Sequence, residues 1–260
     1  MTNHQTLTVS DAAWNDRVDL AAACRLTHLF GWTDLLATHI SIRVPGRNDR
    51  YFVNPLGLLF EEIDASSVLE VDLEGRVITE KGRGAGDLNP AGTVIHGAIH
   101  ATGSPEAEAV VHLHAKDGVA VSCQEAGLLP ITQMALMVYG DLAYHDFQGV
   151  VLDQEERQSL LHDLGDKHNL ILRNHGTLSI GRTMAEAFGR IWRLERACRF
   201  QRAAQSAGAP LRKLPQSVIA RTLKQAQAIT NDQSRFFPAG KREWAAHLRR
   251  LDRELPGFRH

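Results

Sequence analysis

The stretch Val110-Val111-His112-Leu113-His114 places two histidines, one residue apart, at the end of an apolar run. Such a run is typical of a β-strand, in which successive side chains point to opposite faces of the sheet. His112 and His114 are therefore expected on one face, about 6.6 Å apart along the strand. Two imidazoles at that separation can converge on one divalent ion, although two hydrogen-bonded core histidines would give the same pattern.

A third histidine that could complete such a site lies downstream, in Leu170-Ile171-Leu172-Arg173-Asn174-His175-Gly176. Here an apolar strand ends in His175, and the following glycine permits a tight turn. Three neutral imidazoles with one open position are the pattern of a catalytic zinc site. The residues therefore predict one divalent metal ion per chain, with zinc as the first choice and manganese, cobalt or iron as alternatives.

The composition is that of an ordinary globular protein, with 260 residues of which 43% are hydrophobic and 23% charged. The formal net charge of -1 gives no electrostatic reason to expect nucleic acid or an anionic membrane as a partner. Three cysteines far apart in the sequence predict no disulfide framework and fit a reducing compartment. The N-terminus has no signal-peptide pattern, and no apolar run approaches the roughly 20 residues of a membrane span, so we expect a cytoplasmic protein.

Local patterns predict a succession of hairpins and helices. Asn89-Pro90 is a favoured helix start, and Thr183 with Glu186 forms a capping box, as Asp153 does with Glu156. The predicted helices span residues 10–30, 90–102, 116–126, 153–167, 183–206, 216–230 and 240–252. The predicted strands span residues 39–44, 51–54, 69–73, 76–78, 110–114, 141–146 and 170–175. A turn is predicted at 179–181. A glycine-containing loop at 81–89 lacks the Gly-Lys-Ser/Thr ending of a phosphate-binding loop. Without a clear linker, this order favours one α/β domain in which helices cover a mostly antiparallel sheet.

Four motifs follow one another in a recognisable order: Thr38-His39-Ile40-Ser41-Ile42-Arg43, Val53-Asn54-Pro55-Leu56-Gly57, Val110-Val111-His112-Leu113-His114 and Arg173-Asn174-His175-Gly176. In this order the chain resembles the class II aldolase/adducin family over residues 15 to 205. Two further motifs, Asn89-Pro90-Ala91-Gly92 and Tyr144-His145-Asp146, are more similar to the adducin-type branch than to the sugar-phosphate aldolases.

The resemblance implies a single-domain three-layer α/β/α sandwich with a mostly antiparallel central sheet. It divides the chain into an N-terminal tail at 1–14, a class II aldolase/adducin-like domain at 15–207 and a helical C-terminal extension at 208–260. The extension would pack on the same domain or on a neighbouring subunit. Enzymes of the family are usually homotetramers with active sites near subunit interfaces, so the resemblance implies a homo-oligomer. It also implies that His112, His114 and His175 are the metal ligands.

Positions that bind the substrate phosphate in the family's aldolases have changed in this sequence. The asparagine of their Gly-Asn-x-Ser motif falls on His39, and the glycine of their second phosphate loop is kept as Gly57. The paired serines of their third phosphate element fall near Asn89 and Pro90. The resemblance therefore implies that His39, Gly57 and Asn89 bind a small substrate that carries no phosphate group.

The family's catalytic acid and tyrosine are also absent. A Glu or Asp four residues before a helix histidine falls near Gly92 when His96 is aligned, and the tyrosine falls near Gln133 or Met134. Another proton carrier is then needed, and we expect His96 and His145 because an imidazole titrates near neutral pH. Each of these two histidines could instead be structural, and His96 could pair with a second helix histidine in another metal site.

Three functions fit these residues. The first is a metal-dependent lyase that cleaves a C–C bond in a small hydroxy-carbonyl compound, as an aldolase does, because a divalent ion stabilises the enediolate. The second is a metal-dependent decarboxylase or epimerase on the same scaffold. The third is a non-catalytic, adducin-like assembly domain. The intact histidine set favours an enzyme, whereas the lost carboxylate and tyrosine favour the assembly domain.

Overall fold

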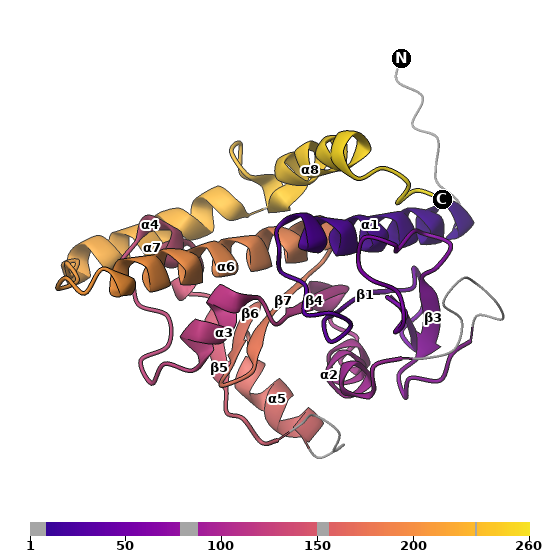
Figure 1. Cartoon of the computed structure of the whole chain (residues 1–260), viewed down its shortest axis with the longest axis horizontal. Helices are drawn as coiled ribbons and strands as arrows, with labels where there is room; N and C mark the ends of the chain where they lie inside the picture. The colour runs from indigo at the N-terminus through magenta and orange to yellow at the C-terminus, as the bar shows by residue number, and fades with distance from the viewer. Residues whose placement is uncertain (1–8, 79–87, 150–155, 232) are drawn as a thin grey trace.

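The computed structural model describes residues 9–78, 88–149, 156–231 and 233–260 (Figure 1). Most of the glycine-containing loop expected at 81–89 lies outside the described residues, as does the expected helix cap at Asp153. No helix within the described ranges is long and apolar enough to cross a membrane.

A seven-stranded sheet forms the centre of the described chain, in the order β3-β2-β1-β4-β7-β6-β5. Its strands are β1 His39–Arg43, β2 Arg50–Val53, β3 Leu69–Asp72, β4 Ala109–Leu113, β5 Leu142–His145, β6 Asn169–Leu172 and β7 Gly176–Gly181. Neighbouring strands pair antiparallel, except that β5 and β6 are parallel. The prediction of a mostly antiparallel sheet is confirmed.

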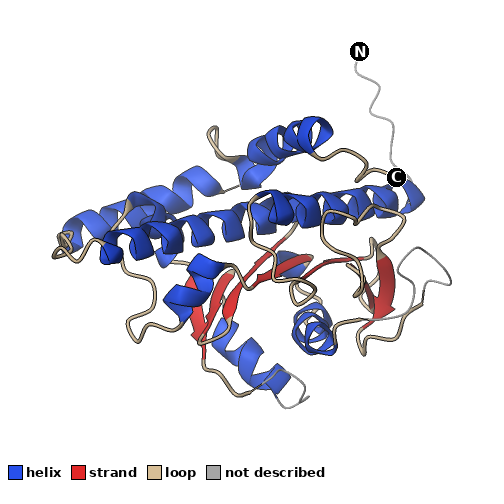
Figure 2. Cartoon of the chain, in the orientation of Figure 1, coloured by secondary structure: helices blue, strands red, loops and turns tan. Residues whose placement is uncertain are grey.

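Helices cover both faces of this sheet, as Figures 1 and 2 show. On one side lie α1 Val9–Leu29, α6 Met184–Ser206 and α8 Lys241–Glu254, and on the other lie α2 Pro90–Ala101 and α5 Glu156–Leu164. Two short helices, α3 Lys116–Ser122 and α4 Gln133–Tyr139, pack against α6, and α7 Gln216–Thr230 packs against α4. The two short 3-10 helices are η1 Pro105–Ala107 and η2 Pro238–Gly240. This arrangement confirms the three-layer α/β/α sandwich.

Two apolar clusters hold the layers together and set which way β4 faces. Val111 and Leu113 belong to the larger cluster, which includes α1 and α6, whereas Val110 belongs to the smaller cluster with residues of α2 and α5. Alternate side chains of β4 therefore enter opposite layers, as strand geometry requires. His112 shares the face of Val110, so its ring lies on the α2 side of the sheet.

The hairpin of β6 and β7 differs from the sequence-based expectation. The strand predicted at 170–175 ends at Leu172, and residues 173–175 turn the chain back with Asn174 in the left-handed region at φ 56°. Asparagine tolerates that region better than most residues. The turn predicted at 179–181 is wrong, because those residues belong to β7, which pairs with both β4 and β6. The glycines at the two ends of β7 suggested a turn where the chain is extended.

Smaller differences concern where elements end. The helix predicted at 116–126 ends at Ser122, and the strand predicted at 76–78 contributes a single bridge between Val71 and Val77. The sequence around residues 128–139 did not reveal its type; α4 forms there, and Thr132 accepts a hydrogen bond from the Ala135 amide at 3.0 Å.

The helices predicted at 216–230 and 240–252 correspond to α7 and α8, and both pack on the same chain. The indole Nε1 of Trp244 in α8 donates to Asp19 of α1 at 3.0 Å, and Phe258 is buried in the larger apolar cluster. Of the C-terminal helices, α8 thus packs against α1 and α6, whereas α7 packs against α4.

Candidate metal centre

Three histidines meet at the end of β4 beside the turn between β6 and β7. His112 lies within β4, His114 follows the strand directly, and His175 is the last residue before β7. The turn approaches β4 closely because Gly176 has no side chain: a Cβ there would lie 2.4 Å from the Leu113 carbonyl oxygen. Glycine at this position therefore brings His175 next to the two histidines of the strand.

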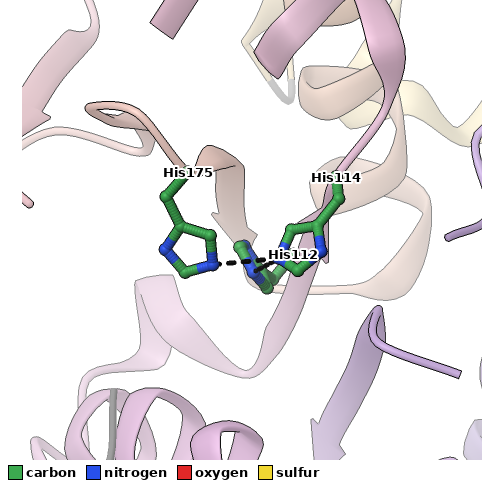
Figure 3. Close-up of side chains that lie close together, drawn as sticks. All are labelled: His112, His114 and His175. Carbon is green, nitrogen blue, oxygen red and sulfur yellow. Dashed lines mark hydrogen bonds between the residues drawn. The ribbon is translucent and has the colours of Figure 1, made fainter. Parts of the chain in front are cut away.

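The three imidazoles face one another through their Nε2 atoms (Figure 3). The Nε2 atom of His114 lies 3.0 Å from that of His112 and 2.9 Å from that of His175. His112 is fully buried, whereas His114 and His175 are partly exposed. The cluster is therefore open to solvent on one side, which leaves a path for a ligand.

The partners of the Nδ1 atoms determine which nitrogens carry protons. His112 Nδ1 donates to the Thr177 carbonyl oxygen at 3.0 Å, and His114 Nδ1 donates to an Asp34 carboxylate oxygen at 3.0 Å. Both partners only accept hydrogen bonds, so each ring carries a proton on Nδ1, and its Nε2 is then the nitrogen that can present a lone pair to a metal ion. Burial and the neighbouring histidines lower the pKa of His112, and burial, then His114 and His145, lowers the pKa of His175 to about 4.

This donor set fits a divalent metal ion. Two bare nitrogens at 3.0 Å cannot form a hydrogen bond with each other, and His175 Nε2–H can donate only to His114 Nε2, so the lone pair of His112 Nε2 lacks a donor within the cluster. A tetrahedral zinc ion with bonds of about 2.0–2.1 Å would hold two such nitrogens about 3.3 Å apart. The separations in the cluster are close to that value, and the ligand atoms of all three histidines lie within 4.8 Å of one another.

Asp34 contacts the candidate metal centre, and no signal in the sequence pointed to this contact. It lies in the loop between α1 and β1, next to Leu35, which has a left-handed backbone at φ 46° and a highly exposed side chain. Its carboxylate orients His114 across 80 residues of sequence. Carboxylates that accept from the second nitrogen of a ligand histidine fix its tautomer and raise its basicity.

Replacing Asp34 with asparagine is expected to weaken metal affinity by about 10- to 100-fold, because the neutral amide no longer puts a negative charge next to the Nδ1–H group of His114. Competition against a chromophoric chelator at constant pH measures the change. Asp49→Asn is the matched control, since Asp49 is an exposed carboxylate that pairs with Arg47. Equal affinities of the Asp34 variant and the wild type would contradict the orienting role.

The sequence of residues 18–202 matches the protein-family model of the Class II Aldolase and Adducin N-terminal domain. The chain belongs to the class II aldolase and adducin family. A solved aldolase II superfamily protein from Pseudomonas syringae is similar, with TM-score 0.86, 42% identity and coverage of 95% of this chain and 96% of that chain. L-fuculose 1-phosphate aldolase from Glaciozyma antarctica PI12 has TM-score 0.82 and 28% identity, over 98% of this chain and 97% of that one.

The chain is also similar to an adducin. Alpha-adducin from Mus musculus is 43% identical over 196 residues, which are 75% of this chain and 26% of the adducin. The chain therefore matches only about a quarter of that relative's length. The family assignment from the four sequence motifs is confirmed.

In this member of the class II aldolase and adducin family, His39 stands beside Gly92. His39 pairs with His112 across β1 and β4, and the two rings lie 4.7 Å apart between centroids. A Cβ added to Gly92 would lie 3.1 Å from Cδ2 of His39. The imidazole at 39 and the glycine at 92 are therefore complementary, because a larger side chain at 92 would press on the ring.

His96 and His145, the expected proton carriers, have both ring nitrogens engaged. His96 Nε2 contacts His39 Nδ1 at 2.7 Å, and its Nδ1 contacts the Ser41 hydroxyl. His145 Nδ1 lies 2.7 Å from Asp163, and its Nε2 lies 3.4 Å from Glu156. His96 thus reaches the three clustered histidines through His39, while His145 forms a separate cluster with carboxylates of α5.

The two remaining expected substrate residues have backbone and capping roles. Gly57 lies in an exposed turn with a φ of 105° that favours glycine. Asn89 caps α2 by accepting from the Ala91 amide at 3.0 Å, and it donates to the Ala37 carbonyl oxygen at 3.3 Å. Within the described ranges, no hydrogen bond joins either residue to His112, His114 or His175.

Proposed function

We propose that this chain is a metal-dependent lyase that cleaves a C–C bond in a small, non-phosphorylated hydroxy-carbonyl compound. The observation that carries the proposal is the convergence of three imidazoles, two of them with tautomers fixed for metal binding. A divalent ion bound there, zinc as first choice with manganese, cobalt or iron as alternatives, would polarise the carbonyl group and stabilise an enediolate.

The chain's own residues would orient the ligands and contact the substrate. Asp34 and the Thr177 carbonyl hold two of the ligand rings in register. His39, which lies against His112, is the side chain best placed to contact a substrate oxygen. His96 supports His39 from within the protein. Gly57 and Asn89 remain proposed substrate contacts, and His145, paired with Asp163, remains a proposed proton carrier.

The replaced phosphate elements support a substrate without a phosphate group. At His39 an imidazole stands where the aldolase motif has an asparagine, and Asn89 acts as a helix cap.

We also propose a cytoplasmic homo-oligomer, a tetramer by analogy with the family, built from the 15–207 domain and the 208–260 extension. Light scattering after gel filtration measures the number of chains.

A metal-dependent decarboxylase or epimerase uses the same enediolate chemistry and is the alternative enzyme. A non-catalytic assembly domain is the other alternative, favoured by the 43% identity to alpha-adducin. Zinc- or manganese-loaded protein should be incubated with unphosphorylated hydroxy-aldehydes, hydroxy-ketones and hydroxy-acids, with product analysis by mass spectrometry and by chiral chromatography, which separates isomers of equal mass.

Each outcome of this assay selects a function. Two carbonyl fragments that are absent with His112→Ala support the lyase. Release of CO2, or inversion at one carbon, selects the decarboxylase or the epimerase. A metal-loaded protein that converts none of the compounds would leave the assembly domain as the better proposal.

A further inference from the structure

Four polar side chains form a buried row between β1 and α2, which we call the histidine row: His39, His96, Ser41 and His100. Residues 39 and 41 share one face of β1, and residues 96 and 100 are one turn apart on α2, so the two pairs interlock. His39 Nδ1 lies 2.7 Å from His96 Nε2, His96 Nδ1 contacts Ser41 Oγ, and Ser41 Oγ lies 2.7 Å from His100 Nε2. All four side chains are buried.

The imidazoles of the row are neutral, because all three rings are buried and no carboxylate contacts them among the residues described. Burial also lowers the pKa of His96, and it lowers the pKa of His100 to about 3. A neutral imidazole carries one proton, on one of its two nitrogens. Each hydrogen bond in the row holds one proton, so the whole row has only two arrangements, which point in opposite directions.

In the first arrangement, protons point from His39 toward His100, which leaves His39 Nε2 bare and puts a proton on His100 Nδ1. In the second, His100 Nε2–H donates to the Ser41 hydroxyl, which donates to His96 Nδ1. His96 Nε2–H then donates to His39 Nδ1, and His39 carries its own proton on Nε2. The ends of the row decide between them.

His100 is the inner end of the row, and its Nδ1 atom is buried without a hydrogen-bond partner among the residues described. An orphaned buried N–H group is rarer than an orphaned acceptor. The Arg43 guanidinium, which pairs with Glu108, also donates to the His100 carbonyl oxygen at 2.8 Å and lowers the pKa of His100. A nearby positive charge favours a bare nitrogen over an N–H group, so both features select the second arrangement.

At the outer end, the Nε2 atom of His39 has no hydrogen-bond partner in the described part of the chain. Its ring lies 4.7 Å from that of His112 between centroids, tilted by 35°, and its Cδ2 atom is the one nearest to the Cβ position of Gly92, with Nε2 at 3.5 Å. A neutral imidazole N–H group in this place could stabilise negative charge that develops on a carbonyl oxygen.

We propose that His39 is a hydrogen-bond donor to an oxygen of the substrate, and that the histidine row holds its proton on Nε2. The substrate contact rests on the proposed function, whereas the position of the proton does not. His39 is then the substrate-contacting residue, and His96, Ser41 and His100 are positioning residues that act through it.

Neutron diffraction from a crystal of deuterated, zinc-treated protein locates the proton directly. We expect deuterium on Nε2 of both His39 and His100, and bare Nδ1 atoms on both rings. Deuterium on Nδ1 of His39 would overturn the proposed direction of the row. This reading needs no substrate, so it decides the arrangement even if the protein proves to bind no metal and the lyase proposal fails.

Binding of glycolohydroxamate, a metal-chelating mimic of an enediolate, tests the donor in zinc-loaded protein by calorimetry. In His39→Gln the amide nitrogen can replace Nε2, whereas in His39→Asn the shorter amide replaces Nδ1 and leaves no donor at the outer end. We expect His39→Gln to bind within a few-fold of wild type and His39→Asn to bind about tenfold more weakly or worse. Wild-type affinity in His39→Asn, or an equal loss in both variants, would overturn the substrate contact.

Ser41→Ala interrupts the row without touching His39 or the metal ligands. We expect unchanged zinc content, weaker hydroxamate binding and deuterium shared between the two nitrogens of His39. Ser179→Ala is the matched control, because Ser179 is also a buried strand serine and donates to Asn169 at 2.7 Å. If Ser41→Ala keeps wild-type affinity and a single proton on His39 Nε2, the row does not fix that proton.

Discussion

Replacing His112 with alanine is expected to lower the metal content from about one ion per chain to near zero. The variant loses the ligand that is both fully buried and fixed by the Thr177 carbonyl, and two partly exposed imidazoles remain. Stabilisation by bound metal should vanish with it; at a free metal concentration 100 times Kd this amounts to about 2.7 kcal/mol. Elemental analysis of protein purified without a metal-affinity tag, and melting with and without added zinc, measure both effects.

The matched control is His162→Ala, because His162 is an exposed histidine on α5 that pairs with the neighbouring Asp163. It should keep the wild-type metal content and the same rise in Tm on addition of zinc. A His112→Ala protein that still binds one ion per chain would contradict the three-histidine site. A well-folded wild type that binds neither zinc nor manganese would remove the basis of both enzyme proposals and favour the assembly domain.

The sequence predicted those parts of the site that depend on local pattern. The alternation in Val110–Val111–His112–Leu113–His114 is a property of one strand, and it placed two imidazoles on one face. Asn89 and Thr183 begin their helices as their types require, because a side-chain oxygen there accepts from the first free amides. His175 followed from a second local pattern, an apolar strand that ends before a glycine, whereas the family resemblance added the three-layer arrangement.

Contacts between distant segments could not be predicted in the same way. Nothing in the sequence around Asp34 distinguishes it from other loop carboxylates, yet it is the one that orients His114. The β6–β7 hairpin was missed because its turn depends on the left-handed conformation of Asn174. Side-chain pairs of this kind follow from packing in three dimensions, which no local period encodes.

The relation between His39 and Gly92 shows a similar limit. In the sequence, His39 and Gly92 are two separate departures from the pattern that the resemblance to the family's aldolases implies. In the structure they are one feature, because the ring of His39 lies against the place where a side chain at 92 would begin. The close contact between His39 and position 92 indicates that the two residues belong to one arrangement of polar groups at the site.

Glu195 of α6 is a buried carboxylate behind the metal centre. Its Oε1 accepts from the Thr177 hydroxyl at 2.5 Å, and its Oε2 accepts from the Gly118 amide at 3.0 Å. Thr177 is also the residue whose carbonyl oxygen holds His112. Burial raises the pKa of Glu195 from 4.5 to about 8, opposed by these two hydrogen bonds and assisted by Asp117.

This raised pKa predicts how stability depends on pH. Between pH 4.5 and about 8 the folded protein holds a proton on Glu195 that the unfolded chain has released. Stability therefore falls as pH rises through this window and levels off above it. The shift corresponds to a loss of up to about 5 kcal/mol from this one group. The Glu195→Gln variant should not lose stability in this pH window, because its amide is neutral at every pH. The amide can still accept from the Gly118 amide and donate to the Thr177 hydroxyl.

Urea unfolding of metal-free wild type and Glu195→Gln, at matched concentrations from pH 5 to 9, measures the difference. Near pH 5 the variant should be equal to the wild type or less stable by about 1 kcal/mol, the size of an altered hydrogen bond. Toward pH 9 it should become the more stable protein by several kcal/mol. Glu254→Gln, a change of an exposed carboxylate at the end of α8, should follow the wild-type curve. Parallel curves for Glu195→Gln and wild type would show that Glu195 is ionised in the folded protein at neutral pH, and that its charge is balanced within the core.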